Sequence, residues 1–397
     1  MTSELSSLCS YAKGKVSVDT LSKRNYVSTE NMMPNKGGIV DAGALPSAQY
    51  TQQYIKDDIL VSNIRPYFKK IWMADDDGGC SNDVLVFRAD RGCDSTFLYY
   101  ILANDAFFNY ASATSKGTKM PRGDKTAIMQ YKVPCFNYET QLRIGKLLRS
   151  IDDRIAVNKK INDNLRQQAQ ALFKKWFVDN PDAILWKEGT FSNLIEKTIS
   201  GDWGKDSPSG NNTEMVYCIR GADIPEVRAG NKGKMPTRYI LPKNYAAKQL
   251  VDGDIVVEIS GGSPTQSTGR AAAVSDALLA RYDKGMVCTN FCKALKPRAG
   301  YSMYVYYYWQ YLYDRDIFFS YENGTTGIKN LDINGFIETE PIVIAPEDLV
   351  EKFDAVCQTV FSKIYANGME NEQLALVRDT ILPKLMSGEI DVSAVQL

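Results

Sequence analysis

The feature that most constrains this chain is a heptad seam that occurs twice. From residue 139 to about 177 the sequence is free of proline, and selected positions recur in alternating steps of four and three. They are Ile144, Leu148, Ile151, Ile155, Asn158, Asn162, Leu165, Ala169, Leu172 and Trp176. Adding 209 to each (367 − 158) reaches a second seam: Phe353, Cys357, Val360, Ile364, Asn367, Asn371, Leu374, Arg378, Ile381 and Leu385. Seams of this length predict two long helices, each of which needs a partner.

Both seams carry two asparagines at matching places. An asparagine on an apolar seam lowers stability, but it disfavours slipped registers because a slip leaves its amide unpaired. We therefore expect the two helices to pack antiparallel, with the register set by Asn158, Asn162, Asn367 and Asn371. The alternative is that Asn158 and Asn162 face solvent at a helix bend. Gly368 predicts a local weakness in the second helix, and Pro383 lies where a kink or a stop is tolerable.

The repeat extends upstream of both helices. FFNYASATSKGT at 107–118 matches FFSYENGTTGIK at 318–329, and STFLYYIL at 95–102 resembles YVYYYWQY at 304–311. DDILVSNIRP at 57–66 pairs with GDIVVEISGG at 253–262, at an offset of 196 (254 − 58). The predicted fold is therefore α+β: two globular, strand-rich mixed α/β domains joined by two long antiparallel coiled-coil helices, with a pseudo-two-fold internal repeat.

The predicted boundaries follow from this pattern. They are a first globular domain at 1–138, a first long helix at 139–178, a second globular domain at 179–346, a second helical region at 347–387 and a tail at 388–397. The first helix ends with apolar side chains on more than one face, and a helix pair hides only one stripe. The remainder must pack on a globular domain or dock another protein, and the residues expected to dock a partner are Phe173, Trp176 and Phe177.

Composition excludes several kinds of site. The chain has no histidine, and Lys plus Arg equals Asp plus Glu at 47 each. Histidine-based triads and metal sites are therefore absent, and any binding of nucleic acid needs locally gathered charge. The eight cysteines are scattered, which is typical of reduced thiols in a cytoplasmic protein rather than of a zinc site. The N-terminus lacks the apolar run of a signal peptide, and nothing is long enough to span a membrane.

No catalytic motif emerges either. SGGSPTQSTGR at 260–270 lacks the lysine of a phosphate loop, PDAILWKE at 181–188 lacks the acidic-x-Lys of a metal-dependent nuclease, and no adenosyl-binding loop follows a strand. We therefore expect no catalytic residue, no metal and no cofactor in this chain.

Basic loops occur in both halves. They lie at 62–72, 115–125 and 228–243 and are interrupted by Gly and Pro. Loops that combine cations with Ser, Thr and Gln can contact phosphates and base edges together, although any one of them could equally be a solvated loop. The residues expected to bind DNA are Ser62, Arg65, Lys69, Lys70, Lys116, Lys119 and Arg122 in the first half, and Arg228, Lys232, Lys234, Arg238, Gln266, Thr268, Arg270 and Lys329 in the second.

These segments resemble a known family. LLRSIDDRIAVNKKINDNLRQQAQALFKKWFVD at 147–179 is similar to the central conserved region of the specificity (S) subunit of type I restriction-modification systems. LVRDTILPKLMSGEI at 376–390 resembles the end of its second conserved region, and DDILVSNIRPYFKKI at 57–71 resembles a motif of its target recognition domains. The resemblance covers the whole chain in order, although the stretch around Asn367, Gly368 and Met369 departs from the pattern.

The resemblance implies a DNA-reading role. Each globular domain would be a target recognition domain for one half of a bipartite, asymmetric DNA site, and the helices would set the spacing of the halves. The helices would also dock two methyltransferase (M) subunits, with restriction (R) subunits in the full complex. S-adenosylmethionine, ATP and Mg²⁺ would act on those partners, and the chain itself would not be an enzyme. The alternatives are a coiled-coil scaffold or anti-restriction protein that binds proteins, and a solitary nuclease or methyltransferase.

Overall fold

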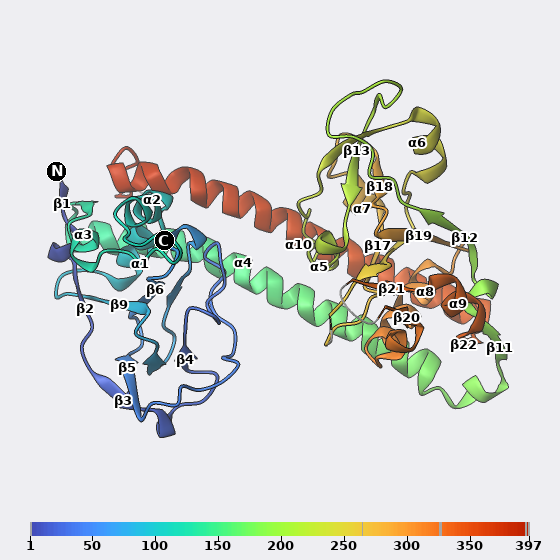
Figure 1. The fold of residues 1–397 in the computed structure, drawn as a ribbon, viewed down its shortest axis with the longest axis horizontal. Helices are drawn as coiled ribbons and strands as arrows, with labels where there is room; N and C mark the ends of the chain where they lie inside the picture. The colour runs from blue at the N-terminus through green and yellow to red at the C-terminus, as the bar shows by residue number, and fades with distance from the viewer. Residues whose placement is uncertain (1, 264, 325–327, 394, 396–397) are drawn as a thin grey trace. The chain divides into compact units, whose positions relative to one another are not determined.

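A computed structural model describes residues 2–263, 265–324, 328–393 and 395, and it divides the chain into two compact units. The first unit contains Met1–Arg154 and Leu374–Leu397, and the second contains Ile155–Gln373. The two longest helices, α4 (Tyr138–Phe173) and α10 (Glu347–Ser387), run through both units, so each unit holds a segment of each helix (Figure 1). The fold is mixed α/β with two long helices and several sheets.

The first unit is built on two four-stranded sheets with orders β2-β9-β6-β7 and β3-β5-β8-β4, and a two-stranded pair, β1-β10. The strands are β1 (Thr2–Glu4), β2 (Cys9–Tyr11), β3 (Lys15–Ser17), β4 (Tyr26–Val27), β5 (Tyr50–Tyr54), β6 (Ile59–Ser62), β7 (Ile71–Met73), β8 (Gly78–Cys80), β9 (Val84–Ala89) and β10 (Lys132–Pro134). The shorter helices are α1 (Ser95–Ala103), α2 (Asp105–Ala113) and α3 (Lys125–Met129). Asp94, Asn104 and Asp124 cap their N-termini by accepting backbone N–H groups.

The apolar runs of β6 and β9 are buried on both faces of their sheet. Along β6, Ile59 and Val61 belong to one core, which contains α1, while Leu60 belongs to a second core beneath Tyr54. Strand β9 alternates in the same way between Leu85 with Phe87 and Val84 with Val86. A strand covered on both faces needs a continuous apolar run rather than an alternating one, which explains the D-I-h-V pattern (h, any apolar residue).

The second unit repeats the first sheet. Its four-stranded sheet has the order β12-β19-β15-β17, which matches β2-β9-β6-β7 of the first unit. Strand β15, like β6, follows an aspartate, and it lies beside β19 as β6 lies beside β9. A three-stranded sheet, β14-β13-β18, and the small sheets β11-β22 and β16-β21-β20 complete it. The strands are β11 (Lys187–Thr190), β12 (Ile195–Ser200), β13 (Glu214–Ile219), β14 (Thr237–Ile240), β15 (Ile255–Glu258), β16 (Ser260–Gly261), β17 (Ala271–Ala273), β18 (Met286–Cys288), β19 (Cys292–Pro297), β20 (Glu322–Asn323), β21 (Lys329–Leu331) and β22 (Pro341–Ile344).

Helix α8 (Ser302–Tyr313) supplies the aromatic centre of this unit. The matching segment of the first unit, α1, is also a helix. Trp309 is fully buried and its Nε1–H donates to the carbonyl of Gly269 at 2.7 Å. The other helices are α5 (Ile224–Arg228), α6 (Pro242–Lys248), α7 (Asp276–Leu279) and α9 (Ile333–Thr339). The repeated segment around 325–327 lies outside the described residues.

The two units also share a buried ion pair. In the first, the carboxylate of Asp58 accepts from Nε and Nη2 of Arg88, at 2.8 and 2.7 Å. In the second, Asp254 accepts from Nζ of Lys296 at 2.9 and 2.7 Å. Each aspartate also accepts the backbone N–H three residues before it, and each is almost fully buried. The shared strand order, and an aspartate–cation pair at the matching place in each sheet, show that the two units repeat one fold.

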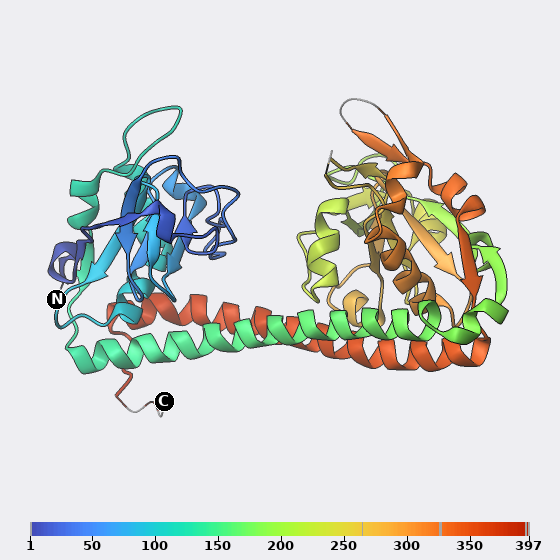
Figure 2. The ribbon, with the colours of Figure 1, turned by 90° about the horizontal axis from the view of Figure 1, so that it is seen from below.

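The long helices pair with their apolar seams inward. Each residue of both predicted seams is buried or half-buried. In the second unit the two helix segments lie side by side (Figure 2). Asn158 bonds to Asn371 and Asn162 bonds to Asn367, so residue numbers rise along one helix as they fall along the other, and the pairing is antiparallel. Helix α10 continues through Pro383 to Ser387.

The four seam asparagines bond to one another across the second unit's helix pair. Asn158 Nδ2 donates to Asn371 Oδ1 at 3.0 Å, and Asn367 Nδ2 donates to Asn162 Oδ1 at 2.8 Å. Asn162 Nδ2 donates in turn to the carbonyls of Ile364 and Ala229, at 3.0 and 3.1 Å. All four are buried, so the alternative in which Asn158 and Asn162 face solvent is wrong. Their role in setting the register stays a prediction.

Gly368 has a different meaning from the one predicted. It is buried against the loop that follows α5, and a Cβ at this position would lie 1.9 Å from the carbonyl oxygen of Gly230. Helix α10 continues through it without interruption. The lack of a side chain at Gly368 therefore lets the Gly230 backbone pack closely against the helix, and this site, which we call the notch, is not a local weakness.

The helices are tied to the two cores by different chemistry. In the first unit, Asp152 of α4 accepts the hydroxyl of Tyr100 at 2.6 Å and pairs with Nη1 of Arg378 at 2.5 Å. In the second unit, the repeat offset of 209 places Phe361 where the first unit has Asp152, and Ala169 where it has Arg378. Both are buried. There the Phe361 ring packs against Tyr307, with ring centroids 6.4 Å apart.

Among the described residues, no helix combines the length and apolar character needed to cross a bilayer. Within the same ranges, no group of three or more acidic or thiol side chains is placed to hold a metal ion.

Candidate nucleic-acid interface

The two basic loops of the first unit lie against each other. The backbone N–H of Arg65 donates to the carbonyl of Pro121 at 2.8 Å, and that of Gly123 donates to the carbonyl of Asn63 at 3.1 Å. Lys116 and Arg122 exchange backbone hydrogen bonds at 2.8 and 2.9 Å, which closes the second loop into a hairpin. Segments that are more than fifty residues apart in the sequence thus form one surface, which we call the paired loops (62–65 and 115–125).

The cations of the 115–125 hairpin are exposed, and two of them are paired with carboxylates. Lys116 pairs with Asp124 at 2.5 Å and Arg122 pairs with Asp83 at 3.2 Å. Lys119 is exposed, and Arg65 is half-buried with an Nε that has no hydrogen-bond partner among the described residues. The hydrogen bonds from Lys116 and from the backbone N–H groups of α3 hold the pKa of Asp124 below its usual value. These exposed ion pairs are weak, so a phosphate can displace the carboxylates from Lys116 and Arg122 at small cost.

Ser62 offers less than the sequence suggested. It is buried, and its hydroxyl donates to the carbonyl of Ile64 at 3.1 Å. It therefore shapes the turn from which Arg65 projects, and its hydroxyl does not face solvent.

Lys69 and Lys70 are engaged outside the paired loops. Nζ of Lys69 contacts Asp105 at 2.8 Å, and Nζ of Lys70 donates to the carbonyl of Thr29 at 2.6 Å. Asp105 also pairs with Lys36 at 2.9 Å. The hydrogen bond from Lys69, assisted by that from Lys36, lowers the pKa of the Asp105 carboxyl. Lys36 is not among the residues predicted to bind DNA, because nothing in the local sequence connects it with a loop about thirty residues later.

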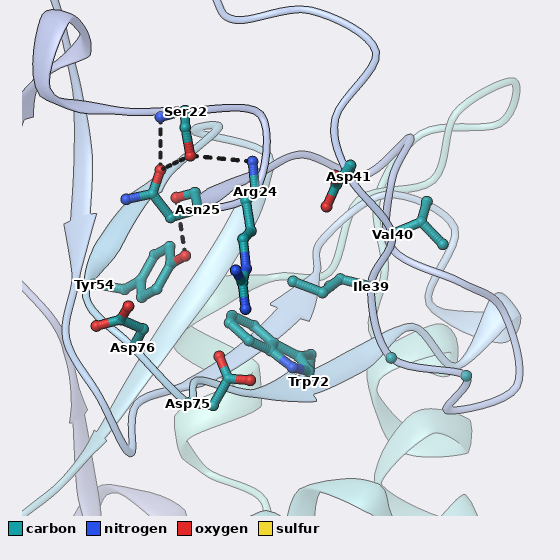
Figure 3. Close-up of a pocket in the computed structure, with 12 residues that line it drawn as sticks. Ser22, Arg24, Asn25, Ile39, Val40, Asp41, Tyr54, Trp72, Asp75 and Asp76 are labelled. Atoms are coloured by element: carbon teal, nitrogen blue, oxygen red, sulfur yellow. Dashed lines mark hydrogen bonds between the residues drawn. The ribbon is translucent and has the colours of Figure 1, made fainter. Parts of the chain in front are cut away.

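A pocket of about 740 Å³ in the first unit lies beside the 33–40 segment (Figure 3). Figure 3 shows the Arg24 side chain extending toward Trp72, with Asp75 and Asp76 near the same end of the pocket. Asp41 adds a third carboxylate to the lining. One cation against three carboxylates repels a phosphate, so this pocket is poorly suited to a polyanion.

The basic loop at 228–243 is less free than expected. The backbone N–H of Lys232 donates to Glu372 of α10 at 3.2 Å, and its Nζ lies 4.5 Å from the ring centroid of Tyr282. Arg228 is half-buried and lines a pocket beside Arg166 of α4. Arg238 is 5% exposed and donates from Nε to the carbonyl of Trp203 at 2.7 Å. Arg238 is therefore not free to contact DNA, whereas DNA contact by the half-buried Arg228 and Lys232 stays a prediction; Lys234 is exposed.

The 260–270 loop gathers the other predicted residues around two glutamates. Both guanidinium contacts of Arg270 to Glu258 measure 2.7 Å, and these hydrogen bonds raise the pKa of Arg270. Lys329 pairs with Glu322 at 2.7 Å, and Thr268 donates to that carboxylate from its backbone N–H and hydroxyl. Thr268 is fully buried, so it supports the loop, whereas Gln266 is exposed.

Beside this loop the structure has an apolar pocket that the sequence analysis missed. It measures about 570 Å³ and is bordered by Trp203, Phe291 and Ile328, together with Glu258 and Arg220. Trp203, Phe291 and Ile328 are 38%, 60% and 67% exposed. Their exposure could not be foreseen, because each is a single apolar residue in a different loop.

The residues expected to dock a partner belong to the second unit's core. Phe173 is fully buried and Phe177 is 3% exposed. Phe177 meets Tyr304 and Phe353 with ring centroids 4.7 and 5.1 Å apart, and Trp176 is half-buried against Phe353. The docking prediction is therefore wrong for Phe173 and Phe177, since their extra apolar surface is covered by this unit itself.

Comparison with known proteins shows which proteins the chain resembles. Residues 1–167 match the family model described as type I restriction modification DNA specificity domain. The chain is 24% identical to the type I restriction enzyme HindI specificity subunit of Haemophilus influenzae, over 92% of this chain and 94% of that protein. It is 26% identical to the type I restriction enzyme MjaIX specificity subunit of Methanocaldococcus jannaschii, over 76% of this chain and 70% of that protein.

A solved structure shares the fold. The crystal structure of a type I restriction-modification system S subunit from M. genitalium aligns with a TM-score of 0.57 at 17% identity, over 97% of this chain and 96% of that one. Residues 1–167 thus match the type I restriction modification DNA specificity domain, and over most of its length the chain is similar to specificity subunits of type I restriction enzymes.

Proposed function

We propose that this chain is the DNA sequence-specificity subunit of a type I restriction-modification complex, with each unit acting as a target recognition domain for one half of a bipartite site. The duplicated sheet with different surface loops carries the proposal. The units share strand order and a buried ion pair, yet the loop after β6 bears Arg65, whereas the loop after β15 is SGGSPTQSTGR. Two copies of one scaffold with different loops suit two different half-sites, and so an asymmetric DNA sequence.

The affinity would come from phosphate contacts. Lys116, Lys119 and Arg122 stand on the exposed hairpin of the paired loops in the first unit, and Lys234 and Gln266 are exposed in the second. Cations that neutralise phosphates release counterions, which makes binding fall with salt. Base edges would be read by side chains of the same loops once those contacts orient the duplex.

The long helices would fix the half-site spacing as an antiparallel coiled coil and dock two methyltransferase subunits, with restriction subunits joining in the cytoplasm. S-adenosylmethionine, ATP and Mg²⁺ would be bound by those partners, and this chain would contribute recognition without catalysis. Proteins of this class would present a methyltransferase with one adenine in each half-site, extruded from the duplex.

The test uses the full chain assembled with its methyltransferase subunits. Methylated adenines are mapped by single-molecule sequencing in the host with and without this gene, and binding to the resulting duplex is measured by mobility shift across a salt series. We expect a bipartite motif that disappears with the gene. The double variant Lys119→Ala/Arg122→Ala should bind about tenfold or more weakly, and its salt slope should shrink by about 0.9 for each lost phosphate contact.

Lys13→Ala is the matched control, because Lys13 is an exposed lysine of the same unit outside the paired loops. It should leave affinity and salt slope unchanged. A chain that binds no DNA at any salt but still assembles with protein partners would instead be a scaffold or an anti-restriction protein. Methylation by the chain alone would establish an enzyme.

A further inference from the structure

Two aromatic rings stand in solvent on one short turn of the first unit. The turn η3 (Pro66–Phe68) follows Arg65 and precedes Lys69. Tyr67 is 52% exposed and Phe68 is 39% exposed, and their ring centroids lie 4.8 Å apart. We call these two rings the aromatic tip. Adjacent exposed aromatic side chains mark interaction surfaces, because leaving apolar area in water is unfavourable.

The backbone of this turn is held in an unusual conformation. Arg65 and Lys69, which flank it, have φ angles of +50° and +51°, in the left-handed region that glycine favours. Two hydrogen bonds close the turn: Phe68 N–H to the Arg65 carbonyl at 2.9 Å and Lys69 N–H to the Pro66 carbonyl at 2.8 Å. Strained residues persist where the surroundings over-determine them, and they cluster at functional sites.

The neighbouring 33–38 segment braces the turn from the other side. The N–H of Asn35 donates to the carbonyl of Phe68 and that of Lys36 to the carbonyl of Lys69, both at 2.8 Å. Asn35 and Lys36 are themselves left-handed, with φ of +55° and +61°. The aromatic tip therefore stands on a rigid, pre-organised base, and its rings lose little freedom on binding.

Positive charge surrounds the tip. Lys36, Arg65, Lys69 and Lys70 lie on the turn or its brace, and Asp105 is the carboxylate that pairs with two of them, which leaves a local charge of +3 (4 − 1). Nζ of Lys70 lies 6.0 Å from the Phe68 ring centroid. Exposed rings among cations suit a partner that is a polyanion and also offers flat apolar faces, and nucleic acid combines these two properties.

We propose that Tyr67 and Phe68 form a stacking wedge that inserts against the bases of duplex DNA held by the first unit. This rests on the proposed function and adds to it a way of reading the first half-site by deformability. Arg65 links the tip to the paired loops through Pro121, so the cations of those loops hold the duplex while the rings partly unstack one base step. Flexible steps unstack more easily, so the wedge favours some sequences without hydrogen-bonding to their bases.

The wedge acts on one half of the site. By the offset of 196 that aligns Asp58 with Asp254, Tyr67 and Phe68 correspond to Ser263 and Pro264, and neither replacement is aromatic. The two copies thus differ in sequence at these two positions.

The test places 2-aminopurine, whose fluorescence rises when it is unstacked, at each position of the methylation-mapped site in turn. The protein is the full chain assembled with its methyltransferase subunits. We expect a rise at one step of the first half-site that does not involve the methylated adenine. The variant Tyr67→Ser/Phe68→Ser should lose this rise, and Tyr67→Phe/Phe68→Tyr should keep it.

Two controls make the outcome decisive. Phe291→Ser removes an exposed ring of the second unit and should leave the first half-site signal intact, and unfolding midpoints verify that each variant is folded. A serine variant that binds DNA and keeps every fluorescence rise would overturn the wedge while the proposed function stands. A serine variant that loses its methyltransferase subunits would make the tip a protein-docking surface. A wild-type complex that binds no DNA would overturn the proposed function as well.

Discussion

At the residue scale, the clearest evidence for duplication is a buried carboxylate and its cation. Asp58 with Arg88 and Asp254 with Lys296 occupy the same places in two sheets, although the cation differs. Burial raises the pKa of Asp254 and the ammonium of Lys296 opposes the rise. Breaking a buried pair on one side leaves an uncompensated charge, which is far more costly than never having the pair.

Lys296→Met should destabilise the protein by about 3 kcal/mol near neutral pH, because Asp254 would remain buried and charged. Without Lys296 the folded-state pKa of Asp254 rises further above its ordinary value of 3.8. A carboxyl with a raised folded pKa binds its proton more tightly when folded, so stability returns as pH falls through that pKa. Urea unfolding should show a larger loss at pH 8 than at pH 5.

The matched control is Lys197→Met, since Lys197 is exposed and lies directly opposite Lys296 in the β12–β19 register. It should change the unfolding free energy by no more than about 0.5 kcal/mol at either pH. Equal losses for the two variants, or a Lys296→Met loss that is independent of pH, would refute this account of Asp254.

At the element scale, buried asparagines interrupt the apolar seam of the helix pair and hydrogen-bond across it. Asn162 accepts from Asn367 and donates to two backbone carbonyls. Asn162→Leu would leave those buried groups unpaired, so we expect a loss of about 1–3 kcal/mol. The double variant Asn162→Leu/Asn367→Leu should recover part of that loss, because it leaves no unpaired side-chain amide. A double variant that is as unstable as the sum of the single ones would contradict the pairing.

The notch at Gly368 allows a second test of the same region. Gly368→Ala would place a methyl group 1.9 Å from the Gly230 carbonyl oxygen, so the loop must move. We expect a loss of about 1–3 kcal/mol in the unfolding free energy. Lys159 occupies the matching position of the first helix (368 − 209) and is exposed, so Lys159→Ala should be neutral. An unchanged midpoint for Gly368→Ala would show that the loop contact carries no weight.

At the scale of the whole molecule, both long helices cross the boundary between the units, α4 after Arg154 and α10 after Gln373. Inserting one heptad at both points preserves the seam and adds about 10 Å of helix, at about 1.5 Å per residue. This corresponds to roughly three base pairs at about 3.4 Å each. If the helices set the spacing of the half-sites, the methylated motif should gain about that many spacer positions. If sequencing shows only the parental spacing, the proposal that the helices set the spacing of the half-sites is wrong.

The duplication, the two long helices and the strand that follows each Asp-Ile pattern could all be predicted from the sequence. These features depend on periodicity and on fixed offsets, which are local or self-comparing signals. Asn158 and Asn162 could be matched to Asn367 and Asn371 before any contact was known. The second seam even carries Arg378 where the first has Ala169, and its ion pair with Asp152 gives that departure a physical reason.

Which basic and aromatic side chains are exposed depends on tertiary packing and could not be predicted from the sequence. Arg238 and Lys119 both belong to segments predicted as basic loops, yet Arg238 lies in β14 and is buried against Trp203, whereas Lys119 is exposed. Phe177 and Phe68 both follow an aromatic residue beside lysines, yet one lies in a core and the other stands on a braced turn. Burial depends on segments distant in sequence, such as Lys36 beside Lys69 or Gly230 beside Gly368, and no local pattern specifies those approaches.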